Sequence, residues 1–211
     1  GDVREAEAAF RVALELNPAN RDAGLGLLRM HLGDFAARQL TDEIAALANR
    51  LTGPSRAALE GWVLGASGNF EQLRELDQRL ASVDARSQLY PVAVKLRVDW
   101  RLWFARSAED RDLAREAMAL LDDLLPSYWN ADLYLLRAAC AATAGALNAM
   151  VESYAAAISQ VQNELKRSVS ADDPGLTRRL DFATAALRDS AAALPKRSLV
   201  SVRIEEILAT L

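Results

Sequence analysis

Side chains that could carry out catalysis are few in this sequence, and they lie far apart. His31 is the only histidine and Cys140 the only cysteine among 211 residues. Nucleophilic catalysis needs a base beside the nucleophile, and no spacing around either residue indicates such a pair. Cys140 stands among alanines, which predicts a buried, unreactive thiol. A Cys/His zinc site is excluded, because one thiol and one imidazole cannot supply its ligands.

Two acidic pairs match metal-binding motifs only in part. Asp122-Asp123-Leu124-Leu125-Pro126 begins like the aspartate motif of helical terpene cyclases, but Pro126 occupies the position of the later carboxylate. Asp172-Asp173-Pro174-Gly175 lacks the alternating ligand spacing of a calcium loop. We interpret the first as solvated carboxylates at a helix end and the second as a turn. The sequence predicts no metal, cofactor or catalytic residue, and we do not expect an enzyme.

Composition and charge describe an ordinary globular chain. Apolar residues make up 51% and charged residues 26%, which is enough to bury a core without disulfides. The net charge of −4 argues against nucleic acid as the main partner, because phosphate binding needs a basic surface. No apolar run reaches the ~18 residues of a membrane helix, so we expect no span here. One thiol fits the cytoplasm, which we favour, and also the periplasm.

Turn residues recur at nearly regular intervals along the chain. Gly33-Asp34-Phe35 and Gly68-Asn69-Phe70 are each preceded, seven residues earlier, by a glycine within an apolar helical pattern. Glu109 and Gly145 continue the register, so the turns fall at positions 1, 33, 68, 109 and 145. The interval between 68 and 109 is the longest and predicts an inserted piece near Ser87–Pro91.

The segments between these turns have a helical pattern. Small and large apolar residues follow one another in steps of four and three and end at a proline, in two stretches: Ala6, Phe10, Ala13, Pro18 and Ala114, Met118, Leu121, Pro126. Such steps place the residues on one helix face, where alanines admit a close neighbour, and proline ends the helix. Each unit is therefore predicted to be a helical hairpin that must stack on the next to bury its apolar faces.

Together these features resemble tetratricopeptide repeats (TPRs). Leu25-Gly26 followed by Gly33-Asp34-Phe35 is similar to the first helix and turn of that repeat, although Arg29 and Glu60 depart from its pattern. The resemblance implies an all-α solenoid with TPR-like repeats over 1–166, the first of them truncated. The chain begins with Gly1 and has no signal-peptide pattern, which also indicates a fragment. A loop over 167–175 and capping helices over 176–211 would follow.

Further helices are expected in the second half of the chain. The periodicity predicts helices over 90–105, 113–125, 131–142, 146–165 and 176–194. The last segment, 198–211, is ambiguous, because Val200, Val202 and Ile204 alternate as in a strand, whereas Ile204, Ile207 and Leu208 repeat as in a helix. We predict a helix, since a lone strand would leave its backbone groups unpaired.

The resemblance also implies a concave binding surface formed by the first helix of each repeat. The positions carried over are Asn20, Ala23, Leu27, Met30, Ser55, Ala58, Trp62, Gly65, Leu96, Asp99, Trp103 and Arg106. Leu27, Trp62 and Trp103 occupy one equivalent position and predict an apolar seam. This seam either packs as core or forms a groove for an amphipathic helix or an extended peptide. It offers no cation for the carboxylate of an acidic tail.

The function predicted from the sequence is that of a protein-interaction scaffold or adaptor, alone or in a membrane-anchored or multi-protein assembly. A helical arm of a larger enzyme and a small-molecule sensor are the alternatives. The alanine- and arginine-rich composition is typical of a bacterial protein. Arg97, Arg101 and Arg106 either form a basic stripe or belong to a mixed, solvated surface, which is the default expectation.

Overall fold

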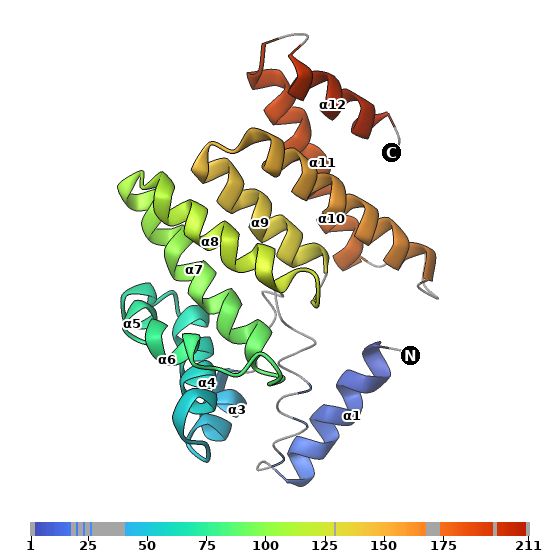
Figure 1. Ribbon diagram of the computed structural model, residues 1–211. Helices are drawn as coiled ribbons and strands as arrows, with labels where there is room; N and C mark the ends of the chain where they lie inside the picture. Colours follow the sequence, from blue (N-terminus) through green and yellow to red (C-terminus); the bar gives the residue numbers. More distant parts are fainter. Residues whose placement is uncertain are drawn as a thin grey trace. The chain divides into compact units, whose positions relative to one another are not determined.

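The chain is helical throughout the part that the structure describes. This computed structural model describes residues 3–17, 20, 23, 26, 41–128, 130–167, 174–195 and 198–209, and these contain no strand. The helices are α1 (Val3–Leu16), α3 (Thr41–Ala48), α4 (Gly53–Ala66), α5 (Phe70–Glu75), α6 (Asp77–Ala81), α7 (Tyr90–Ala108), α8 (Arg111–Leu124), α9 (Ala131–Ala144), α10 (Leu147–Arg167), α11 (Pro174–Ala193) and α12 (Leu199–Leu208) (Figure 1). The predicted all-α class is confirmed.

The chain forms two compact units, whose boundary falls within α7. The first unit is Gly1–Trp103 and the second is Phe104–Leu211. In the first unit α4 is central, because α3, α5 and α6 all pack on it. In the second unit each helix from α8 to α12 packs on the next one along the chain (Figure 1).

Glycines inside the helices of the first unit allow close packing. A Cβ atom on Gly61 would lie 3.0 Å from Leu96 Cδ1 and 3.2 Å from Leu73 Cδ1, and one on Gly65 would lie 3.0 Å from Leu96 Cδ2. The Leu96 side chain of α7 therefore rests directly against the backbone of α4. Gly26 serves the same purpose against Phe10, since a Cβ there would fall 2.5 Å from the Phe10 ring.

Three of the predicted turns share one local geometry. Gly68, Glu109 and Gly145 have φ values of 73°, 54° and 74°, in the left-handed region. One backbone hydrogen bond recurs at all three turns, because the amides of Asn69, Asp110 and Ala146 donate to the carbonyls of Leu64, Ala105 and Ala141 at 2.9, 2.9 and 2.8 Å. This bond is typical of a helix that ends in a left-handed residue. The turns at 68, 109 and 145 are confirmed, and Gly33 lies outside the described residues.

Glu109 pays a conformational penalty at its turn that the two glycines avoid. A side chain in the left-handed region costs about 1–2 kcal/mol, partly offset because glycine loses about 0.5–1 kcal/mol more backbone entropy on folding. We therefore expect Glu109→Gly to raise the free energy of unfolding by about 0.5–1 kcal/mol in urea denaturation. Gly145→Ala is the matched control and should lower the free energy of unfolding, because alanine is strained at a φ of 74°. A Cβ there meets no atom closer than 3.8 Å, so a steric clash does not contribute. Equal stability of the two variants would contradict this account.

The second unit confirms the predicted periodicity of its helices. Ala114 and Leu121 of α8 are fully buried, and Met118 between them is half-buried. In α10, Met150, Tyr154 and Ala157 follow one another in the same steps of four and three and are buried. Residues 199–208 form a helix, so the strand alternative is wrong. In that helix Ile204 is buried and Val202 is exposed, because the two lie on different faces.

Several element boundaries differ from the predictions by one to three residues, and two differences are larger in consequence. The helix after Gly68 is interrupted at Leu76, where α5 ends and α6 begins one residue later. Pro91 lies in the first turn of α7, as predicted. The predicted loop 167–175 is too long at both ends, because Arg167 still belongs to α10 and Pro174 already begins α11.

Candidate partner-binding surface

Several residues predicted to line a concave groove are buried. Ala23, Ala58 and Trp62 are 3%, 0% and 7% exposed, and Leu96 is buried against α4. Ser55 is half-buried, and the Asn20 side chain accepts a hydrogen bond from the Ala23 amide at 3.1 Å. Leu27 and Met30 lie outside the described residues. At Ala58 and Trp62 the structure therefore corresponds to the packing alternative.

The remaining predicted positions, on α7, lie nearer the surface. Trp103 is 42% exposed and stacks on Phe70 of α5, with ring centroids 5.6 Å apart. Asp99 accepts from Lys95 Nζ at 2.6 Å within the same helix. Arg106 is exposed, and its Nε lies 3.5 Å from Thr143 Oγ1. The predicted apolar seam thus divides into a buried Trp62 and a surface Trp103.

The basic stripe considered for α7 does not form, because two of its arginines bind one carboxylate. Arg101 donates to both Asp77 oxygens at 2.6 and 3.0 Å, and Arg97 Nε donates to Oδ1 at 3.1 Å. Trp100 Nε1 donates to the same oxygen at 3.0 Å, and the Arg101 guanidinium lies 4.2 Å from the Trp100 ring centroid. We call Asp77, Arg97, Trp100 and Arg101 the Asp77 cluster.

The Asp77 cluster strongly favours the ionised carboxylate. Burial raises the pKa of Asp77, but hydrogen bonds from Arg101, Trp100 and Arg97, together with the Arg101 charge, outweigh this and lower the pKa to about 2. All three donors lie on α7, whereas Asp77 begins α6. The cluster therefore links α6 to α7, and the charges of Arg97 and Arg101 are neutralised within the first unit.

The side chains considered for metal binding or catalysis are not assembled into a site among the described residues. Asp122 and Asp123 are exposed at the end of α8, as predicted, and Asp122 also accepts from Arg137 Nε at 2.6 Å. Cys140 is buried, as predicted. His31 and the Asp172-Asp173 pair lie outside the described residues.

The described residues offer neither a metal site nor a membrane-spanning helix. No group of three or more His, Cys, Asp or Glu side chains is placed to hold a metal ion. Nor does any helix in the part of the chain described here combine the length and the apolar character needed to cross a bilayer.

A pocket of about 410 Å³ lies over α4, with α3 and Asn49 on one side and α5 and Leu76 on the other. We call it the α4 pocket. It is lined by Ala45, Ala48, Asn49, Glu60, Val63, Leu64, Gln72, Glu75 and Leu76. The lining is largely apolar, with carboxylates and amides as its polar groups. It therefore combines an apolar interior with polar groups that can orient a bound molecule.

Helical spacing explains how these residues come together. Glu60, Val63 and Leu64 are three and four residues apart and share one face of α4, whereas Trp62 lies on another face. Ala45 and Ala48 present small side chains from α3, which leaves space above α4. The interruption of the helix at Leu76 forms the opposite wall. The sequence analysis missed these residues, because their spacing within each helix is ordinary and only packing shows which faces surround a space.

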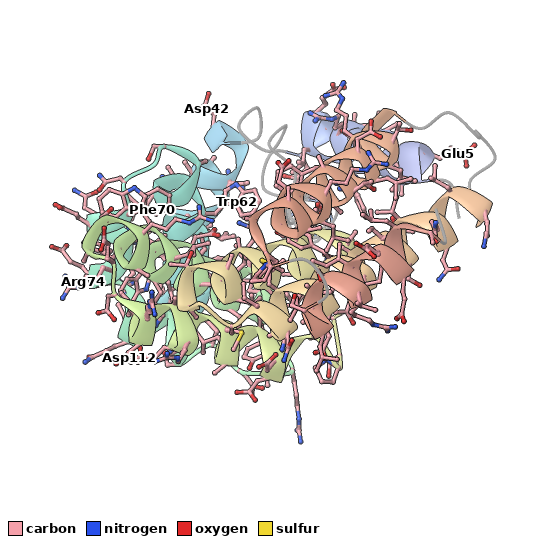
Figure 2. All side chains as sticks on the ribbon, turned by 90° about the horizontal axis from the view of Figure 1, so that it is seen from above. Glu5, Asp42, Trp62, Phe70, Arg74 and Asp112 are labelled. Carbon is pink, nitrogen blue, oxygen red and sulfur yellow. The ribbon has the colours of Figure 1, made fainter. Side chains whose placement is uncertain are left out.

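Two carboxylates line the α4 pocket, Glu60 and Glu75, and two arginines lie beside the first of them. Glu60 Oε1 pairs with Arg56 Nε at 2.6 Å, and Glu60 Oε2 lies 3.6 Å from Arg79 Nη2. Glu75 is exposed and makes no ion pair with a described residue. Asp42, one helical turn before Ala45, is also exposed, and Figure 2 shows its side chain extending away from the ribbon.

We compared the chain with protein-family models, with curated proteins and with solved structures, and none of the three comparisons gives a match.

Proposed function

We propose that this chain is a non-catalytic protein-interaction module of stacked, TPR-like helical hairpins that binds a segment of a partner protein. Support for the repeat architecture comes from the equivalent turns at Gly68, Glu109 and Gly145, each closed by the same backbone hydrogen bond. Further support comes from the sequential packing of α8 to α12. The observation that carries the binding proposal is the α4 pocket.

The size and lining of the pocket favour binding through apolar side chains. A volume of about 410 Å³ lies within the range of ~300–1,000 Å³ found for ligand sites. Val63, Leu64 and Leu76 offer apolar surface, and each large apolar side chain buried there would contribute about 1.5–3 kcal/mol before the loss of translational freedom is subtracted. We therefore expect binding in the micromolar range or weaker.

A variant that fills the pocket tests this proposal. Asn49 is exposed and lines the pocket, so Asn49→Trp should occupy the space while leaving the core intact. Asn163→Trp, at an exposed position of α10, is the matched control. We expect partner proteins captured by the wild-type chain, once identified and purified, to bind Asn49→Trp at least about tenfold more weakly in calorimetry and to bind the control unchanged.

Two results would contradict the proposal. Captured proteins that bind Asn49→Trp and the wild-type chain equally would show that the pocket is not the site. Thermal stabilisation of the wild-type chain by a metabolite, abolished by Asn49→Trp and without any pocket-dependent protein partner, would indicate the small-molecule sensor instead.

A further inference from the structure

We infer that the Asp77 cluster positions one wall of the α4 pocket, because it holds the break at Leu76 that separates α5 from α6. Asp77, Arg97 and Arg101 are then positioning residues for the pocket, although they are not among the described residues that line it. This inference rests on the proposed function and identifies the contacts that shape its binding site.

The break lies in the pocket wall itself. Leu76 lines the pocket and is the single residue between α5 and α6 (Figure 1). Its amide donates to the Leu73 carbonyl at 3.2 Å, only three residues back. The regular helical bond to the fourth residue back resumes with the Leu80 amide, which donates to the Leu76 carbonyl at 2.9 Å. The position of the Leu76 side chain therefore depends on the geometry of the break.

The sequence of this segment does not by itself explain the break. Residues 70–81 contain neither Gly nor Pro, the residues that usually kink a helix. Most of them are Glu, Gln, Leu and Arg, which favour the helical conformation. Such a composition predicts one continuous helix, so the break follows from tertiary contacts.

Asp77, the first residue after the break, is held in a fixed direction by α7. Arg101 donates to both of its carboxylate oxygens at 2.6 and 3.0 Å, and Arg97 Nε donates to Oδ1 at 3.1 Å. An Arg–carboxylate pair with two bonds fixes orientation as well as position. An acidic residue in the first turn also favours the start of a new helix at this point. These contacts therefore set the direction in which α6 leaves Leu76.

Leucine packing on α4 is the competing explanation for the break. Leu73 precedes the break and Leu80 follows it, and their Cδ atoms lie 3.2 and 3.5 Å from the position that a Cβ on Gly61 would occupy. Residues seven apart share one face of a continuous helix, and apolar contacts have no preferred direction. The leucines are therefore compatible with a continuous helix, whereas the directional bonds of Asp77 favour the break.

Spin labels on opposite walls measure the pocket directly. Asn49 and Glu75 line it and are exposed, so Asn49→Cys/Glu75→Cys accepts two labels, whereas Cys140 is buried. Electron paramagnetic resonance then gives the distance between the labels. We expect Asp77→Asn to shift or broaden this distance distribution, because it removes the charge that binds two arginines. Arg97→Gln, a milder change that deletes one donor, should act in the same direction and by less.

Asp99→Asn is the matched control. It changes the net charge by the same amount as Asp77→Asn and also removes a carboxylate from an ion pair. The ion pair of Asp99 with Lys95 Nζ, at 2.6 Å, lies within α7. Its loss should leave the distance distribution unchanged.

Binding measurements on the unlabelled chain separate this inference from the proposed function. Partner proteins that Asn49→Trp no longer binds should bind Asp77→Asn at least about threefold more weakly and Asp99→Asn unchanged, because a site loses affinity when its wall is no longer held in place. A distance distribution that neither Asp77→Asn nor Arg97→Gln changes would overturn the inference. The leucines on Gly61 would then hold the break, and the interaction function would stand. A changed distribution with unchanged binding of the partner would support the positioning role and contradict the pocket as the binding site.

Discussion

Asp77→Ala is expected to destabilise the first unit by about 3–5 kcal/mol, because it leaves buried cations without their counter-ion. The Arg101 side chain is only 10% exposed, and its guanidinium makes two hydrogen bonds to the Asp77 carboxylate. Domains of this size are typically stable by about 5–15 kcal/mol, so the loss is a large part of the total. Urea denaturation followed by tryptophan fluorescence measures it, since Trp100 belongs to the cluster.

An exposed ion pair provides the control for Asp77→Ala. Arg203 Nη1 and Glu206 Oε2 are 3.0 Å apart on α12, and both side chains are more than half exposed. Such pairs contribute at most about 1 kcal/mol, so Glu206→Ala should change stability little. If Asp77→Ala is no more destabilising than Glu206→Ala, the Asp77 cluster does not hold α6 to α7.

The low pKa of Asp77 also predicts a pH dependence. Its folded value of about 2 lies below the ordinary value of 3.8, so the unfolded chain binds the proton more tightly. The stability that the ionised carboxylate contributes is present above about pH 4 and is lost as the pH falls towards 2. The wild-type chain should therefore lose more stability than Asp77→Asn over this interval in parallel urea titrations. Parallel curves would contradict the assigned charge interactions.

Leu187→Ala should destabilise the second unit by about 2–5 kcal/mol, because it removes a fully buried side chain and leaves a cavity. Leu187 of α11 belongs to a buried cluster that includes Met150, Ile158 and Ile204, from α10 and α12. The loss corresponds to a decrease in melting temperature on the order of 10 °C, measurable by calorimetry.

Phe182→Ala is the matched control for Leu187→Ala. Phe182 lies on the same helix but is 59% exposed, so its removal should change stability by less than about 0.5 kcal/mol. Similar effects of the two substitutions would mean that α11 is not held through Leu187. Hydrogen exchange at α12 would then identify which other contacts retain the C-terminal helices.

The turns were the most predictable part of this fold, because their chemistry is local. At Gly68 and Gly145 a residue without Cβ adopts the left-handed conformation at little cost, and one backbone hydrogen bond closes the turn. Even Glu109, which has a side chain, lies at a turn, as the register of the recurring turns predicts. A turn of this kind can therefore be predicted from a few neighbouring residues.

The candidate site could not be predicted in the same way. Trp62 and Leu64 are both apolar residues of α4 with helical spacing, yet Trp62 is buried and Leu64 lines the open pocket. The difference depends on which helices cover each face, and this is a property of the assembled unit. The ion pairs of Asp77 with Arg97 and Arg101 likewise join residues that are 20 and 24 positions apart in the sequence, and no local pattern indicates them.

The amino-acid sequence by itself determined the helical class, the positions of three turns and the buried faces of α8 and α10, because backbone dihedral preferences and apolar periodicity act over a few residues. Tertiary structure decided which face of α4 stays open and which charges are neutralised internally. These properties depend on distances between segments that are remote along the chain, and packing alone sets those distances.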